Sequence, residues 1–334
     1  MKRLSADLAA DPFHEREACP HRMRIDILGA RFDFESNSRA VLRLVDKAFG
    51  NLPVHKLSGE LPHLRARLLV SPDSDSDLAE EPPTMRLHSG PGILCGTVDA
   101  ANFAVVSAAQ RTALVVVSRS MLDFPYHLRY ELIEFAVYTL ASRAQQLISL
   151  HAGCVGSDGR GVLLIGASGN GKSTLSLHAA LRGLDLVAED GILATPDTLL
   201  ATGIGSFLHL REDSLGFVND RIAGRIRKSP VIRRRSGVEK FELDLRRTPY
   251  SIAASPLKIA SVVVLTKQRA GRDDSLLQPL SKEALLRHLA ESQPYALNQP
   301  GWPQFSKQLL QAGGYELRRG RHPDEGVMAL ETLV

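Results

Sequence analysis

The stretch GVLLIGASGNGKSTLSLHAALRGLDLVAED, residues 161–190, carries the clearest structural pattern in this chain of 334 residues. Four apolar residues at 162–165 predict a buried strand. A glycine-rich turn follows, and apolar residues at helical spacing then lead to Gly183. A second apolar run ends at Glu189 and Asp190. The order strand, turn, helix and strand is typical of α/β domains that bind phosphate groups.

The turn matches the pattern G-x-x-x-x-G-K-[ST] in full. In such a loop the glycines let several backbone N–H groups point inward, and the helix N-terminus adds partial positive charge. We expect Lys172 to reach the β- and γ-phosphates of a nucleotide and the Ser173 hydroxyl to bind Mg²⁺. The candidate nucleotide contacts are Gly166, Ser168, Gly169, Asn170, Gly171, Lys172, Ser173 and Thr174.

Two acids and one histidine lie close to this loop in sequence. Glu189 and Asp190 follow Lys172 by 17 and 18 residues. A carboxylate there can hold Mg²⁺ or accept a proton from an attacking hydroxyl. His151 precedes Lys172 by 21 residues, and the turn GSDGRG brings the chain back toward the loop strand. A surface turn and a structural histidine are the alternative interpretations.

At these positions the sequence resembles the catalytic domain of bacterial HPr kinase/phosphorylase and the related HPr-kinase-like serine kinases. The matching residues are His151, the loop from Gly166 to Ser173, and VAED at 187–190. The resemblance covers about residues 150–250. It implies an α/β fold with a C-terminal HPr-kinase-like P-loop domain, similar in fold to ATP-dependent phosphoenolpyruvate carboxykinase. A smaller N-terminal α/β domain would precede it.

The resemblance also implies the chemistry of the site. ATP is the expected phosphoryl donor, and Ser173, Glu189 and Asp190 are the expected ligands of Mg²⁺. Either Asp190 or Glu189 would accept the proton of the acceptor hydroxyl, and His151 would orient an acid or touch the γ-phosphate. Members of this family often form oligomers, so a homo-oligomer is expected.

The sequence departs from the family pattern at three positions. Glu189 replaces the first aspartate, so its carboxylate reaches one methylene further. Ala167 and Thr174 stand where family members that also remove phosphate often carry acids. The resemblance therefore implies a kinase more than a phosphorylase.

Basic residues are frequent between 211 and 247, after the phosphate loop and the two acids. Related kinases show an L-R-L segment similar to the one here, which makes Arg211 a candidate contact to phosphate or substrate. Ten Lys and Arg residues lie between 221 and 247. They form either a solvated basic loop or a mobile arm whose charge stabilises the transferring phosphoryl group. Candidate arm residues are Arg233, Arg234, Arg235 and Lys240. Base-stacking aromatics are absent from 221–240, which argues against a nucleic-acid partner.

Composition sets only broad limits on the protein. Hydrophobic residues make up 44% and charged residues 23%, as in soluble globular proteins, and the net charge of +4 suits an anionic ligand or an acidic partner. Cys19, Cys95 and Cys154 are far apart and imply no disulfide framework. The N-terminus lacks an apolar h-region, and no apolar run reaches transmembrane length. We expect a cytoplasmic protein without membrane contact.

The chain is expected to divide into three segments. Residues 1–22 are polar and expected to be loosely ordered, and residues 23–120 predict a small α/β domain, a candidate for substrate recognition. A long amphipathic helix predicted to begin at Pro125 leads into the phosphate loop, so residues 121–334 are assigned to the catalytic domain.

The leading functional hypothesis is an ATP-dependent kinase that phosphorylates a hydroxyl. Serine of a small protein or precursor peptide is the favoured acceptor, either an HPr-like protein or a peptide of the lasso-peptide type. A non-catalytic nucleotide-binding sensor and a small-molecule kinase are the alternatives, because a phosphate loop alone does not name a reaction.

Overall fold

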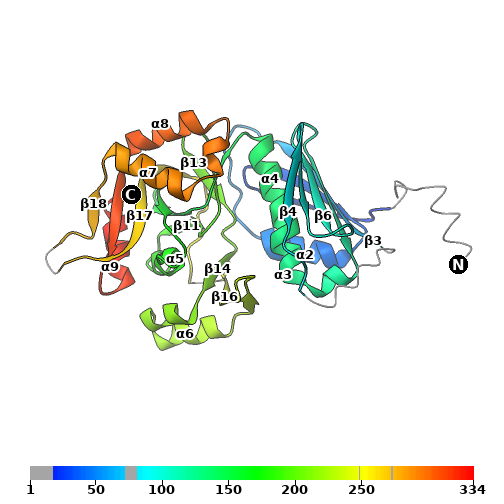
Figure 1. Ribbon diagram of the computed structural model, residues 1–334. Helices are drawn as coiled ribbons and strands as arrows, with labels where there is room; N and C mark the ends of the chain where they lie inside the picture. The colour runs from blue at the N-terminus through cyan, green and yellow to red at the C-terminus, as the bar shows by residue number, and fades with distance from the viewer. Residues whose placement is uncertain (1–17, 72–80, 248, 272–273) are drawn as a thin grey trace, which may run out of the picture. The chain divides into compact units, whose positions relative to one another are not determined.

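The computed structural model describes residues 18–71, 81–247, 249–271 and 274–334. Two compact units are distinguished by their internal contacts (Figure 1). Unit 1 comprises the chain up to Ile25, Phe32–Ala48 and His63–Leu140, and unit 2 comprises Asp26–Arg31, Phe49–Pro62 and Ala141–Val334. Sheets and helices occur in both, which confirms the predicted α/β class. The prediction of a loosely ordered N-terminus falls almost entirely on residues 1–17, outside the described ranges.

Unit 1 is built on one sheet, which has seven strands within the described residues, in the order β1-β2-β3-β7-β6-β5-β4. The strands are β1 His21–Ile27, β2 Ala30–Ser36, β3 His63–Ser71, β4 Arg86–Gly90, β5 Ile93–Thr97, β6 Phe103–Ser107 and β7 Thr112–Ser118. β3 and β7 are parallel, whereas β7, β6, β5 and β4 pair antiparallel in succession. Every second residue of β2 is buried, including Phe32 and Phe34, so one face of the sheet carries the core.

The helical segments that lie wholly or mostly in unit 1 are α2 Arg39–Phe49, η1 Ser120–Asp123, α3 Pro125–His127, η2 Leu128–Ile133 and α4 Glu134–Ala144, whose last four residues belong to unit 2. The helix predicted from Pro125 is present, but η2 is a π-helical turn within it. Buried positions still recur every four residues through this segment, at Leu128, Leu132, Ala136 and Leu140. The sequence pattern predicted a domain boundary near residue 120. In the structure the last change from unit 1 to unit 2 falls after Leu140.

Unit 2 contains the loop strand and a central sheet of nine strands within the described residues. The main order is β11-β9-β10-β17-β13-β12-β8, and β19 pairs with β17 and β18. The strands are β8 Ile148–Leu150, β9 Gly153–Ser157, β10 Arg160–Ile165, β11 Asp185–Ala188, β12 Ile192–Ala194, β13 Leu200–Gly203, β17 Leu257–Arg269, β18 Leu277–Pro279 and β19 Gly314–Arg319. β10 runs parallel to β17, and β17 runs parallel to β19.

Helices cover both faces of this sheet, which explains why β10 is apolar from Val162 to Ile165 (Figure 1). Leu163 and Ile165 join one core cluster with side chains of α7 and α8, while Val162 and Leu164 join the other with α5 and α9. The helices are α5 Lys172–Leu181, α7 Lys282–Ser292, α8 Trp302–Ala312 and α9 Pro323–Glu331, with the short turn η4 Ala296–Asn298. Within the described ranges, no helix of either unit combines the length and the apolar character of a membrane span.

A small antiparallel sheet lies beside the second core cluster and carries part of the site. Its described strands are β14 Phe207–Leu210, β15 Val231–Arg233 and β16 Glu239–Asp244, in the order β14-β16-β15, and the helical segments η3 Glu212–Phe217 and α6 Asp220–Arg227 connect them. Leu208 pairs with Leu243 and faces the core, so His209 and its partner Glu242 lie on the opposite face with Lys240.

We predict that Gly156→Ala will destabilise unit 2 strongly. Gly156 pairs with Gly161 in the β9–β10 hairpin, and a Cβ at Gly156 would lie 1.8 Å from the carbonyl oxygen of Arg160. Backbone must move to relieve that overlap, which costs at least about 1–3 kcal/mol. Urea unfolding of wild type and variant measures the loss. Gly216→Ala, where nothing lies within 4 Å, is the matched control, and equal midpoints for both variants would contradict the hairpin geometry.

Candidate phosphate-binding and catalytic site

The loop between β10 and α5 has the backbone geometry that its glycines permit. Gly169 and Gly171 have φ values of 81° and 98°, in the left-handed region that favours glycine. Two side chains fasten the loop from outside: Asn170 donates its amide to the carbonyl of Leu265 on β17 at 2.7 Å, and Arg319 on β19 donates to the carbonyl of Gly169 at 2.9 Å. The loop is therefore anchored by the strand β17 that borders β10 and by β19 beyond it.

Lys172 lies folded back into this loop. Its ammonium donates to the carbonyl of Gly166 at 2.5 Å, and the residue is 9% exposed. Burial lowers the pKa of Lys172, and Lys240 adds to this effect, while the carboxylates of Asp190 and Glu189 oppose it. The Lys172 ammonium thus lies near Asp190 and Glu189, the two acids that the sequence singled out.

The other predicted loop contacts lie at the start of α5 and on the loop surface. Ser168 and Gly169 are exposed, and Ser173 is half-buried in the first turn of the helix. The Thr174 hydroxyl lies 2.9 Å from the hydroxyl of Ser214 in η3. Thr174 thus joins the loop helix to η3.

Glu189 and Asp190, although adjacent, occupy different environments. Glu189 is buried, and its two carboxylate oxygens lie 3.1 Å from the backbone nitrogen and 3.2 Å from Nδ1 of His209. Asp190 is half-exposed, with Oδ1 3.3 Å from Nδ1 of His151. Partial burial raises the pKa of Asp190, His151 lowers it, Glu189 raises it further, and Lys172 opposes the rise. The more accessible carboxylate is that of Asp190.

His151 is held by its backbone rather than by its ring. Gln293, at the end of α7 and 2% exposed, accepts from the His151 N–H at 2.8 Å and donates to the His151 carbonyl at 2.9 Å. The imidazole is then directed at Asp190 from a fixed position. Gln293 and His209 are positioning residues that the sequence pattern did not indicate, because their partners are 142 and 20 residues away.

Arg211 and the basic hairpin are placed differently. The Arg211 guanidinium lies 3.7 Å from the carboxylate of Asp213 in η3, and both side chains are exposed. The β15–β16 hairpin instead carries Lys240, which acts on the pKa of Lys172, and Arg234, which acts on the pKa of Asp190. The structure therefore brings the hairpin cations to the acids and the lysine, while Arg211 contacts a surface acid.

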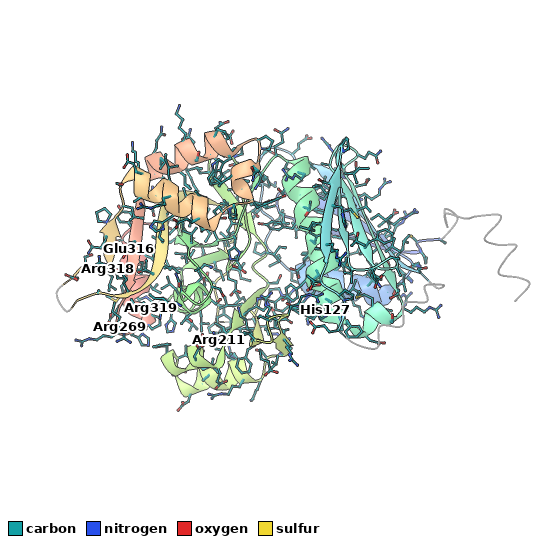
Figure 2. The ribbon with its side chains drawn as sticks, viewed as in Figure 1. His127, Arg211, Arg269, Glu316, Arg318 and Arg319 are labelled. Carbon is teal, nitrogen blue, oxygen red and sulfur yellow. The ribbon has the colours of Figure 1, made fainter. Side chains whose placement is uncertain are left out.

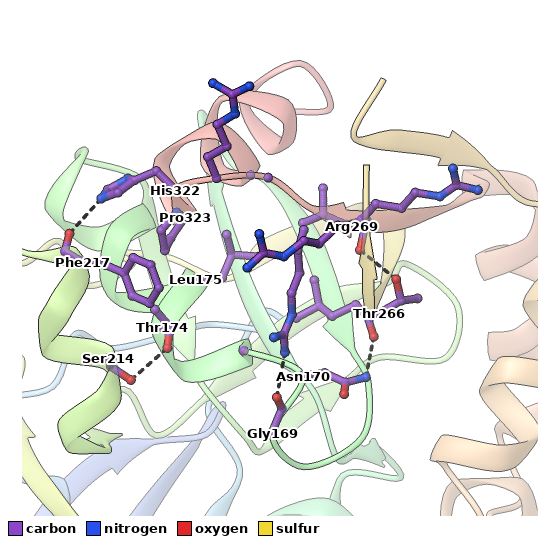
Figure 3. A pocket seen from close by; sticks show the side chains of 18 of the residues that line it. Gly169, Asn170, Thr174, Leu175, Ser214, Phe217, Thr266, Arg269, His322 and Pro323 are labelled. Carbon is purple, nitrogen blue, oxygen red and sulfur yellow. Dashed lines mark hydrogen bonds between the residues drawn. The ribbon is translucent and has the colours of Figure 1, made fainter. Parts of the chain in front are cut away.

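A cavity of about 460 Å³ opens beside the loop (Figure 3). Its floor is formed by the loop from Gly169 to Gly171 and the first turn of α5, and its walls by η3, the ends of β17 and β19, and the start of α9. Phe217 supplies an aromatic surface that is 41% exposed. Figure 2 shows Arg269, Arg318 and Arg319 gathered at the ends of β17 and β19. The cavity combines an apolar wall with cations, as a nucleotide requires.

The oxygen ligands of Mg²⁺ are available at this site. Mg²⁺ prefers one or two carboxylates together with phosphate oxygens and water. The Ser173 hydroxyl and the Asp190 carboxylate supply such oxygens, whereas the Glu189 oxygens already accept from His209. The donor chemistry of Ser173 and Asp190 is therefore of the kind that Mg²⁺ prefers.

We predict that Glu189→Gln will lower the free energy of unfolding by about 1–3 kcal/mol. The amide would present an NH₂ group where the backbone or ring N–H of His209 needs an acceptor, and one buried polar group would lose its partner. Urea unfolding measures the change. Glu212→Gln, which weakens an exposed pair with Arg227, is the control and should shift stability by less than about 1 kcal/mol. Equal shifts for the two variants would contradict a structural role for Glu189.

Comparisons with known proteins give little beyond this geometry. No protein-family model and no curated protein matches the chain. Among solved structures, it is similar to the HPr(Ser) kinase/phosphatase from Coxiella burnetii. That likeness has 16% sequence identity and a TM-score of 0.29, and it covers 55% of this chain and 87% of that chain. Function is therefore inferred from the site itself.

Proposed function

We propose that this chain is an ATP-dependent kinase that transfers the γ-phosphoryl group to a hydroxyl. The observation that carries the proposal is the meeting of Lys172, Asp190 and His151 at an anchored phosphate loop. The positive charges of Lys172, Lys240 and Arg234 lie near the carboxylates of Asp190 and Glu189. Such an arrangement suits a polyanion that loses a phosphoryl group beside a general base.

In the proposed reaction the loop N–H groups and Lys172 hold the β- and γ-phosphates. Mg²⁺ held by Ser173 and Asp190 would supply charge neutralisation for the phosphate oxygens. The acceptor oxygen forms a bond to the γ-phosphorus while the bond to the β–γ bridging oxygen breaks, and ADP leaves. The hydroxyl proton moves to a carboxylate oxygen of Asp190, whose raised pKa improves it as a base.

Asp190 is a better candidate for the base than Glu189. Both oxygens of Glu189 lie against donors of His209, and its side chain is buried. Asp190 has one oxygen near His151 and is half-exposed, so a substrate hydroxyl can approach it. His151 acts as a positioning residue, held in turn by Gln293.

The nucleoside of ATP is proposed to lie in the cavity beside Gly169–Gly171, with its base against Phe217. The favoured acceptor is serine of a small protein or precursor peptide, with unit 1 as the recognition domain. We propose a cytoplasmic protein, and a homo-oligomer by the family resemblance.

The test is transfer of label from γ-labelled ATP in the presence of Mg²⁺ to a panel of acceptors. The panel contains free serine, an HPr-like protein and short serine-containing peptides. Label on one acceptor identifies both the reaction and its substrate class. ATP binding without transfer to any hydroxyl would contradict the kinase and favour a nucleotide-binding sensor, whose output should survive substitution of both acids.

A further inference from the structure

A second cluster of residues that can bind a metal lies where α5 meets the start of α9. His178 lies on α5, His322 caps the N-terminus of α9, and Asp324 lies in the first turn of α9. One ligand atom from each lies within 4.8 Å of the others. Asp324 is central: Oδ1 lies 2.7 Å from His178 Nδ1, and Oδ2 lies 3.3 Å from His322 Nδ1. None of the three belongs to the catalytic group around Lys172.

The tautomer of His322 is set by its surroundings. Its Nε2 lies 3.0 Å from the carbonyl oxygen of Phe217, as Figure 3 shows. A carbonyl oxygen only accepts, so Nε2 carries the proton and Nδ1 presents a lone pair toward Asp324. Metal-binding histidines are typically oriented in this way, by donation of the far ring N–H to a backbone carbonyl.

His178 offers a second nitrogen from the buried side. The residue is 3% exposed, and its Nδ1 faces Asp324. Within the described part of the chain, its Nε2 has no hydrogen-bond partner. The bond from Nδ1–H to Asp324 therefore fixes the tautomer of His178, and a metal ion that binds Nδ1 must displace the proton that lies between His178 and Asp324.

We propose that His178, His322 and Asp324 bind one divalent ion of the Zn²⁺ class. Two imidazole nitrogens and one carboxylate oxygen form a donor set that suits Zn²⁺ and not Mg²⁺. Ligands at the usual zinc distances are roughly 3.3 Å apart in a tetrahedral site. Asp324 Oδ2 lies at 3.3 Å from His322 Nδ1, while Oδ1 lies at 2.7 Å from His178 Nδ1 and would move outward to share an ion. His322 also lines the cavity beside the phosphate loop, and Asp324 is 43% exposed, which gives the ion an entry path and an open coordination position.

Such an ion would join α9 to α5, the helix that begins in the phosphate loop. The alternative is a hydrogen-bonded cap, because the Asp324 N–H also donates to His322 Nδ1 at 3.2 Å. The two interpretations are distinguished by metal binding. The cap needs no metal, whereas the proposed site binds one Zn²⁺ ion per chain in a saturable way.

The test uses the full chain after removal of metals with EDTA. Calorimetric titration with Zn²⁺ and visible absorption on titration with Co²⁺ should both give one site per chain. Asp324→Asn and His322→Ala should each weaken Zn²⁺ binding by more than about 100-fold, beyond the ~10–100-fold typical of residues outside the ligand set. His288→Ala, on α7 near Glu291, is the matched control and should leave binding unchanged.

Three results would overturn the proposal. They are the absence of saturable Zn²⁺ binding by folded wild type, unchanged Zn²⁺ binding in both ligand variants, and loss of binding in the His288→Ala control. Asp190→Asn should retain the zinc site, so failure of the kinase proposal and failure of this one give different results. Circular dichroism of each variant separates lost binding from lost folding.

Discussion

Asp190→Asn is expected to lower the rate of phosphoryl transfer by about 10²–10⁴-fold while the protein still binds ATP. Asparagine keeps the shape of the side chain but cannot accept the hydroxyl proton. Single-turnover transfer from γ-labelled ATP, together with equilibrium binding of ATP, measures the two effects separately. Asp197→Asn, in an exposed turn, is the control and should transfer at the wild-type rate. A small change in rate for Asp190→Asn would remove this residue from the chemistry.

Asp190 also makes the stability and the activity of the protein depend on pH, and the direction of its pKa shift fixes the sign of both effects. Because the pKa of Asp190 is raised, its protonated form is favoured in the folded protein relative to the unfolded chain. Asp190 therefore stabilises the fold at a pH below the pKa that it has in the unfolded chain. This contribution is lost as pH rises through the higher pKa that it has in the folded protein. At neutral pH the ionised carboxylate therefore opposes folding, and Asp190→Asn should be as stable as wild type or more so. Activity should fall as pH drops through the raised pKa.

Lys172→Met is expected to lower kcat/KM for ATP by about 10²–10³-fold or more. The ammonium is buried and lies near Asp190 and Glu189, so its removal would leave two carboxylates facing the phosphates without a compensating charge. Phosphate binding should suffer more than nucleoside binding, which titrations with ATP and with adenosine would show. Lys267→Met, at an exposed position of β17, is the control. Equal affinity of wild type and Lys172→Met for ATP would contradict the proposed loop contact.

The sequence predicted the parts of the fold that depend on short-range patterns. The strand β10, the loop, α5 and β11 follow from apolar spacing and glycines within 30 residues. The hairpin turn between β9 and β10 predicted only that His151 lies toward the loop, and the family resemblance implied that it would orient an acid; the structure places its ring 3.3 Å from Asp190. The pattern could not distinguish the buried Glu189 from the half-exposed Asp190, because both follow the same strand and the difference is made by His209.

Long-range packing decided what the pattern left open. Gln293 holds His151 from 142 residues away, and a glutamine at a helix end has no distinctive spacing. The cavity is lined by segments of η3, β17, β19 and α9 that are adjacent only after the sheet has formed. The π-turn in the helix after Pro125 contains neither glycine nor proline, so no residue in it marked the change to the sequence pattern.

The pairing of β10 with β17 has a consequence for synthesis of the chain. Leu163 pairs with Val262, so the strand that ends in the phosphate loop must wait for a partner made about 100 residues later. At the usual rates of translation this delay is on the order of 5–20 s. During that time β9 can cover one edge of β10, but the other edge offers unpaired backbone groups of a strand that is apolar from Val162 to Ile165. The nascent chain therefore passes through a period in which the strand leading to its phosphate loop has one edge open to pairing with other chains.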